Sequence, residues 1–157
     1  MTVVTVSCSG IIDAPANDIW NTLRAFVGNE KFNPLVTSSM LEGSTSAIVG
    51  CKRICYVSLD SGKNVLRTEE VLDSLDERNR IMTYTVVSAP GTPFEDLINQ
   101  IGVVSLSNNK TEVTLTGTMT EKDDLNMDTN KKILYDTYYG IINGLKNLHE
   151  RKKGSSR

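Results

Sequence analysis

Six strand-like segments follow one another in the middle of the chain, and this series constrains the fold more than any other feature. Short stretches rich in Gly, Asn, Asp and Pro separate them, and such stretches favour tight turns. In the last segment apolar residues alternate with threonines, as in a strand with one buried face. Connections this short join antiparallel neighbours. The segments are Leu35–Leu41, Val49–Leu59, Val65–Leu75, Ile81–Ser88, Leu97–Ser107 and Thr111–Thr120.

Helical patterns flank this series on both sides. A first strand over residues 2–12 is followed by Asp13, which can cap a helix, and by Pro15, which suits a first helical turn. Apolar residues then recur at helical spacing as far as Gly28, and residues 30–32 are a candidate for a second short helix. A long helix, capped by Asp128 or Thr129, is expected to run to about residue 152. Its apolar stripe consists of Ile133, Leu134, Tyr138, Ile141, Leu145 and Leu148.

This order of elements predicts an α+β fold. A curved seven-stranded antiparallel sheet would wrap around the long C-terminal helix, with one or two short helices after the first strand. The 157 residues suit a single domain over 1–153, with 154–157 as a disordered tail or cloning remnant. A strongly curved sheet does not close tightly around one helix, so we expect a concave space of the kind that holds ligands.

Charge and composition exclude several classes of partner. The net charge of −2 provides no basic surface for phosphates, so we expect no nucleic-acid partner. No apolar run approaches the roughly 18–20 residues of a membrane span, and the N-terminus alternates like a strand rather than a signal peptide. These features predict a cytoplasmic protein, a monomer or weak homodimer, whose partner is a small hydrophobic molecule.

The cysteine and histidine residues argue against a metal or nucleophilic site. Cys51 and Cys55 share one face of a strand, which gives two zinc ligands without a second pair. We therefore expect reduced, buried thiols. His149, the only histidine, lies near the end of the long helix, so a Ser-His or Cys-His mechanism is not expected. No phosphate loop or nucleotide fingerprint is present, and no cofactor or metal is predicted.

Short motifs along residues 3–150 resemble the Bet v 1/START-like (SRPBCC) superfamily, in its polyketide cyclase/dehydrase-like branch. Their order and spacing carry the resemblance. It implies a helix-grip fold with a hydrophobic cavity, and the superfamily includes cyclases, hydrolase-like enzymes and carriers of lipids and steroids. The motifs are Ser9–Ala16 with Ile19-Trp20, Phe32-Asn33-Pro34, Leu41-Glu42-Gly43, Val49–Arg53, Glu70–Asp76 with Tyr84, and Gly144-Leu145 with Leu148.

Two departures from the superfamily bear on the ligand. Phe32 stands where many relatives carry the tryptophan of a Trp-Asn-Pro motif. Thr37 stands where the related hormone receptors carry a lysine that pairs with the hormone's carboxylate. An acidic ligand would therefore lack its most obvious cationic partner.

Glu70 is the first candidate for chemistry. Leu66, Thr68, Glu70 and Leu72 share one face of a strand, and the resemblance implies that this face lines the cavity. A carboxylate in an apolar cavity would have a raised pKa and could act as a general acid or base. The alternative is a structural or ligand-orienting carboxylate, paired with Arg53 or bridged by water.

Neighbouring elements contribute further wall residues. Tyr84 and Met82 share the face of the next strand, and a tyrosine hydroxyl could orient a ligand's oxygen or bond to the backbone. The resemblance places Cys55 and Val57 in the wall. It also puts the loop with Pro90 to Phe94 at the mouth, with Phe94 as a lid residue or part of a stiff turn.

The long helix carries a stripe of Asp136, Gly140 and Gly144 at i, i+4 and i+8. The resemblance points this stripe at the cavity, with Asp136 as a second interior carboxylate and Tyr139 beside it. In the alternative, Asp136 sits at the mouth in water and the glycines serve only packing.

Three functions follow from these expectations. The first is a carrier or binding protein for a lipid, sterol, polyketide or terpenoid. The second is a cofactor-independent cyclase, dehydratase or hydrolase-like enzyme that uses Glu70, with Asp136 or Tyr84. The third is a protein-binding module whose cavity is vestigial.

Overall fold

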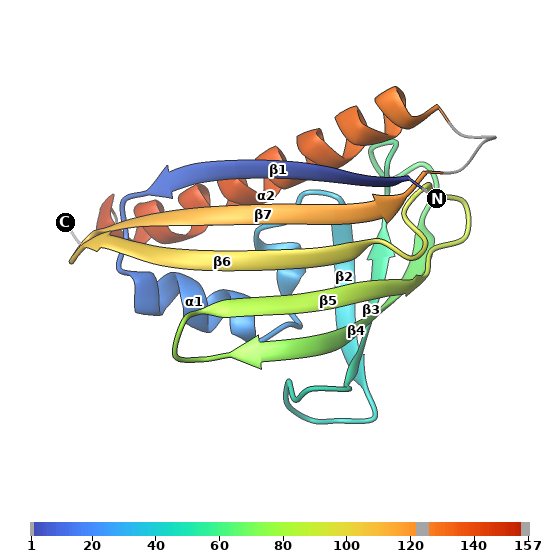
Figure 1. Ribbon diagram of the computed structural model, residues 1–157. Helices are drawn as coiled ribbons and strands as arrows, with labels where there is room; N and C mark the ends of the chain where they lie inside the picture. The colour runs from blue at the N-terminus through green and yellow to red at the C-terminus, as the bar shows by residue number, and fades with distance from the viewer. Residues whose placement is uncertain (1, 122–125, 155–157) are drawn as a thin grey trace.

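The computed structural model describes residues 2–121 and 126–154 of the chain. Within these residues, seven strands and the helices follow the predicted order (Figure 1). The strands are β1 (Val3–Ile12), β2 (Val36–Glu42), β3 (Lys52–Val57), β4 (Leu66–Asp76), β5 (Ile81–Ser88), β6 (Ile98–Ser107) and β7 (Lys110–Thr120). The helices are α1 (Ala16–Arg24), a 3-10 helix η1 (Asn29–Lys31) and α2 (Met127–Gly154).

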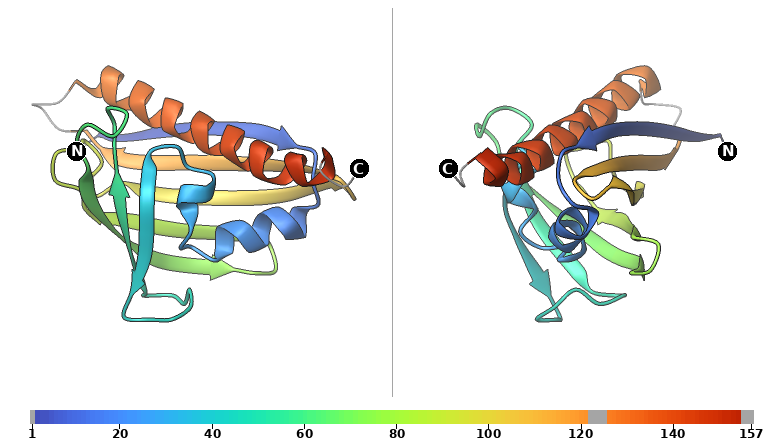
Figure 2. Two further views of the ribbon diagram at one scale, coloured as in Figure 1. Left: turned by 180° about the vertical axis from the view of Figure 1, so that it is seen from behind. Right: turned by 90° about the vertical axis from the view of Figure 1, so that its left-hand side faces the viewer.

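The strands form one antiparallel sheet in the order β1-β7-β6-β5-β4-β3-β2. The sheet curves around α2, which lies along its concave side next to β1 and β7 (Figures 1 and 2). The seven-stranded helix-grip architecture is therefore confirmed. The register between β4 and β5 shifts between Glu69 and Glu70 and again between Leu72 and Ser74. Such bulges bend a strand, and the first of them lies beside Glu70.

The first helix has a different start from the predicted one. Pro15 occupies the N-cap position of α1 without a side-chain hydrogen bond, so the cap predicted at Asp13 is wrong. The helix buries Ile19, Trp20 and Leu23 in the core. It ends before Phe26, whose positive φ of 65° turns the chain toward η1. A bulky residue rarely adopts this left-handed conformation.

The long helix α2 has the predicted apolar stripe. Leu134, Tyr138 and Ile141 are buried against the sheet, as is Leu145. The first turn is capped by Asn126, whose side-chain oxygen accepts a hydrogen bond from the Thr129 amide, rather than by Asp128 or Thr129. The tail predicted at 154–157 begins at the last helical residue, Gly154, and otherwise lies outside the described residues.

The helices of the described ranges include none that is both long enough and apolar enough to cross a membrane. The three cysteines, Cys8, Cys51 and Cys55, are buried free thiols, as predicted.

Candidate functional site

A cavity of about 110 Å³ lies between the concave face of the sheet and α2. Its walls are mostly apolar side chains from β3 to β6, from α2 and from the segment between α1 and β2. The β3–β4 loop contributes Leu59, and the β5–β6 loop contributes Thr92 and Phe94. These two loops and the start of α2 lie at the same end of the sheet (Figure 1).

The structure places most of the predicted wall residues at this cavity. The ones that line it are Cys55, Val57, Thr68, Glu70, Met82, Tyr84 and Phe94. Leu66 does not belong to the lining, because its side chain lies beside Gly91 in the β5–β6 loop.

The prediction that Asp136 and Tyr139 point into the cavity is wrong. The Asp136 side chain is 59% exposed and accepts a hydrogen bond from Lys132 Nζ at 2.7 Å, one turn away. Tyr139 is 55% exposed. The face of α2 that meets the cavity carries Leu134, Thr137, Tyr138 and Ile141 instead.

Gly140 and Gly144 also lie outside the cavity, and they serve packing. A Cβ atom at Gly144 would collide with the backbone carbonyl of Phe32, and one at Gly140 would come within 3.3 Å of Pro34 Cγ. The glycine stripe therefore lets the segment between α1 and β2 approach the helix backbone. Phe32 and Asn33 of that segment form part of the cavity wall. The two glycines therefore help to position this part of the wall, although they do not line the cavity themselves.

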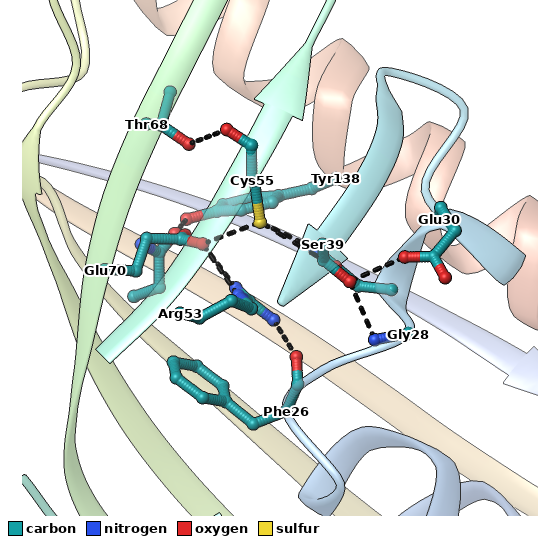
Figure 3. Close-up of polar contacts among 11 residues, drawn as sticks. Phe26, Gly28, Glu30, Ser39, Arg53, Cys55, Thr68, Glu70 and Tyr138 are labelled. Atoms are coloured by element: carbon teal, nitrogen blue, oxygen red, sulfur yellow. Dashed lines mark hydrogen bonds and ion pairs between the residues drawn. The ribbon is translucent and has the colours of Figure 1, made fainter. Parts of the chain in front are cut away.

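The polar end of the cavity is built around an ion pair between Arg53 and Glu70. These residues are directly opposite each other on β3 and β4. Arg53 donates from Nε to Glu70 Oε1 at 2.8 Å, and its Nη2 lies 2.7 Å from the same oxygen (Figure 3). The Arg53 and Glu70 side chains are only 6% and 12% exposed. Of the two roles that the sequence left open for Glu70, the structure thus shows the second, a carboxylate that is paired with Arg53.

Phe26 completes the surroundings of Arg53. Its backbone carbonyl accepts a hydrogen bond from Arg53 Nη1 at 2.5 Å. The Arg53 Cζ atom lies 4.1 Å from the centre of the Phe26 ring and 4.9 Å from that of Tyr84, distances at which a cation and an aromatic face attract. The left-handed backbone of Phe26 directs both its carbonyl and its ring at the guanidinium. The strained backbone conformation of Phe26 therefore lies next to the Arg53–Glu70 pair.

Cys55 joins the same cluster from β3. Its thiol lies 3.4 Å from Glu70 Oε1 and 3.6 Å from Asn29 Nδ2, a residue of η1. Burial raises the pKa of the Cys55 thiol to about 12, although the charge of Arg53 opposes this shift. Because the thiolate is the nucleophilic form, Cys55 is an unreactive donor to Glu70 rather than a nucleophile.

Two tyrosines border the cluster. Burial raises the pKa of Tyr84, and the negative charge of Glu70 adds to the effect. Burial also raises the pKa of Tyr138, whose hydroxyl donates to Asn99 Oδ1 at 2.6 Å. Both phenols are therefore neutral hydrogen-bonding groups at physiological pH.

Sequence reasoning overlooked Phe26, Asn29 and Asn99 as members of the site. Phe26 follows the spacing of the first helix, but that helix ends at Arg24 and the turn after it places Phe26 against Arg53. Asn29 reaches the cavity from η1, a short segment that no periodic pattern marks. Asn99 had a usable signal, since it is a polar residue on the inward face of β6, two residues before the buried Ile101.

Comparisons with known proteins agree with this fold. Residues 1–138 match the family described as "Polyketide cyclase / dehydrase and lipid transport". The fold is also similar to that of several solved structures, all of low sequence identity.

Three of these structures illustrate the range of relatives. The Zhui aromatase/cyclase from a Streptomyces species has 18% identity and a TM-score of 0.74, with 96% of each chain covered. A START superfamily protein from Mycobacterium smegmatis has 12% identity and a TM-score of 0.78, with 94% of this chain and 97% of that one covered. Ginseng major latex-like protein 151 from Panax ginseng has 15% identity and a TM-score of 0.76, with the same coverage.

Proposed function

We propose that this chain, which belongs to the polyketide cyclase/dehydrase and lipid transport family, is a carrier or binding protein for a small hydrophobic molecule. The ligand would occupy the cavity between the sheet and α2. The observation that carries the proposal is the contrast between the mostly apolar walls of this cavity and the buried ion pair of Arg53 with Glu70, whose charges are paired with each other. Pockets of this kind bind the apolar body of a ligand and orient it by few polar contacts.

The arrangement of Glu70 favours binding over acid–base catalysis. A general acid or base has to exchange a proton with its substrate. Here Oε1 of Glu70 already accepts from Arg53 and lies next to the Cys55 thiol. The second interior carboxylate of the enzyme hypothesis is missing, because Asp136 is on the surface. Glu70 is therefore better suited to orient a bound ligand than to catalyse a reaction on it.

Native mass spectrometry tests the proposal. The purified protein is measured before and after incubation with an extract of its source organism. We expect a defined extra mass that is released on denaturation. An extract component that is converted without being retained would instead support the cyclase or hydrolase-like alternative, and no adduct with an unchanged extract would contradict binding.

Adjacent residues of β3 supply a matched pair of variants. Val57 lines the cavity, whereas Tyr56 points to the opposite face of the sheet and is 36% exposed. Val57→Trp places an indole in the cavity and should abolish the adduct, while Tyr56→Trp should retain it. An adduct that persists in Val57→Trp would place the ligand elsewhere.

A further inference from the structure

We infer that the cavity selects a compact, uncharged molecule with a single hydroxyl group, of the simple phenol class, and that it rejects carboxylic acids because Glu70 already occupies its anion site. The inference rests on the proposed function, since it names the class of ligand for that same cavity.

Arg53 is the cation that would attract an acid, and its charge is already used. It pairs with Glu70, donates to the Phe26 carbonyl and lies over the rings of Phe26 and Tyr84. Burial disfavours the charged form of Arg53, and the negative charge of Glu70 offsets this and raises its pKa overall. A ligand carboxylate would have to displace Glu70 or remain unpaired beside it in a poorly solvated space, and either costs free energy.

Glu70 also has a carboxylate oxygen that can accept a hydrogen bond from a ligand. The contacts recorded for its carboxylate, among the residues that the structure describes, all go to Oε1. Because Glu70 lines the cavity, Oε2 remains available to a donor on a ligand. A hydroxyl group would form a charge-assisted hydrogen bond there, whereas a purely apolar ligand would displace water without replacing its hydrogen bond.

The volume limits the size of the ligand. Drug-sized ligands occupy pockets of about 300–1,000 Å³, and an apolar cavity of about 150 Å³ is known to hold benzene. The volume here is about 110 Å³. With its loops in this arrangement the cavity therefore suits a small molecule rather than a drug-sized one.

Calorimetric titration of the wild-type protein with phenol, toluene and benzoate tests the inference. The three probes share a ring and differ in their substituent. We expect phenol to bind about ten-fold more tightly than toluene, the effect of one hydrogen bond to a charged group, and benzoate not to bind. Toluene or benzoate binding as tightly as phenol would overturn the inference while leaving the proposed function intact. If no probe binds but the extract gives an adduct, the ligand class is wrong; if both fail, the proposed function fails as well.

Two variants assign the selectivity to the ion pair. Glu70→Gln leaves the charge of Arg53 uncompensated, so benzoate should now bind and phenol should weaken about ten-fold. Because this variant could fold poorly, the double variant Arg53→Met/Glu70→Leu replaces the pair by apolar side chains, an exchange that buried ion pairs often tolerate. There toluene should bind at least as well as phenol. A double variant that still prefers phenol would contradict the assignment.

Glu69→Gln provides the matched control. Glu69 is the neighbour of Glu70 on β4 and points away from the cavity, where it pairs with Lys52 and Arg67. This variant should keep the wild-type order of affinities. A changed order would show that surface charge, rather than the buried pair, controls selection.

Discussion

Arg53 and Glu70 face each other across the β3–β4 ladder, in the register that a hairpin centred on Ser61 and Gly62 requires. The two residues are equally far from this turn along their strands. Their side chains lie on the same face of the sheet, which is the concave one. Local turn chemistry therefore brings a cation and an anion together inside a mostly apolar space.

Removing one member of the pair should destabilise the fold more than removing both. Arg53→Met should lower the free energy of unfolding by about 3–5 kcal/mol, because Glu70 is left charged and buried. Arg53→Met/Glu70→Leu should recover most of this loss. Urea denaturation followed by circular dichroism measures the effect. If the loss in the double variant equals the sum of the two single losses, the residues are not coupled. Asp136→Ala, at an exposed ion pair, should change stability by less than about 0.5 kcal/mol.

The two helix glycines should respond differently to alanine. In Gly144→Ala the new methyl group would collide with the Phe32 carbonyl, and the backbone has to shift, at a cost of about 1–3 kcal/mol. In Gly140→Ala the methyl group meets only the ring of Pro34, with Cγ at 3.3 Å and Cδ at 3.7 Å. The gain in helix propensity of up to about 1 kcal/mol should offset this contact. Thermal unfolding of both variants tests the difference, and equal effects would be inconsistent with the close approach at Gly144.

Tyr138→Phe tests the hydrogen bond to Asn99. The variant leaves the buried Asn99 side-chain oxygen without its donor, and we expect a loss of about 1–3 kcal/mol in urea unfolding. Tyr139→Phe is the control on the next residue, since Tyr139 is exposed, and it should stay within about 0.5 kcal/mol of the wild type. A Tyr138→Phe protein as stable as the control would mean that this hydrogen bond adds nothing to stability.

Stability should fall at alkaline pH. Burial raises the pKa of Cys55 from 9.0 to about 12, so above pH 9 the unfolded chain binds fewer protons than the folded one. The stabilisation from this group is complete below pH 9 and is lost as the pH rises toward 12, by up to about 1.4 kcal/mol per pH unit. Tyr84 and Tyr138, whose pKa values are raised too, add to the fall above pH 10. Urea unfolding between pH 8 and 11 should show a shallower fall for Cys55→Ala, and an identical fall would contradict the prediction.

The strands and their order could be predicted because the signals are local. Alternation identified the buried face of β7, and turn residues placed each hairpin within a few positions. β3 is shorter than predicted, since Gly50, with a φ of 93°, and the hydrogen bond from the Cys51 amide to the Ile48 carbonyl form a turn where the strand was expected to begin. The wall residues of β3, β4 and β5 followed from the alternation together with the resemblance.

The sequence by itself thus determined the element types, the antiparallel sheet and the apolar stripe of α2, because each depends on residues close together in the chain. Tertiary structure alone decided how α2 is rotated about its own axis, and so which of its faces meets the cavity. Its glycine stripe meets Phe32 and Pro34 rather than the cavity, since two backbones can approach closely only where side chains are missing. The same packing brings Phe26 of the α1–η1 turn onto Arg53 of β3. Contacts between such distant segments leave no periodic signal in the sequence, so only the folded chain could reveal that Phe26 packs against the guanidinium of Arg53.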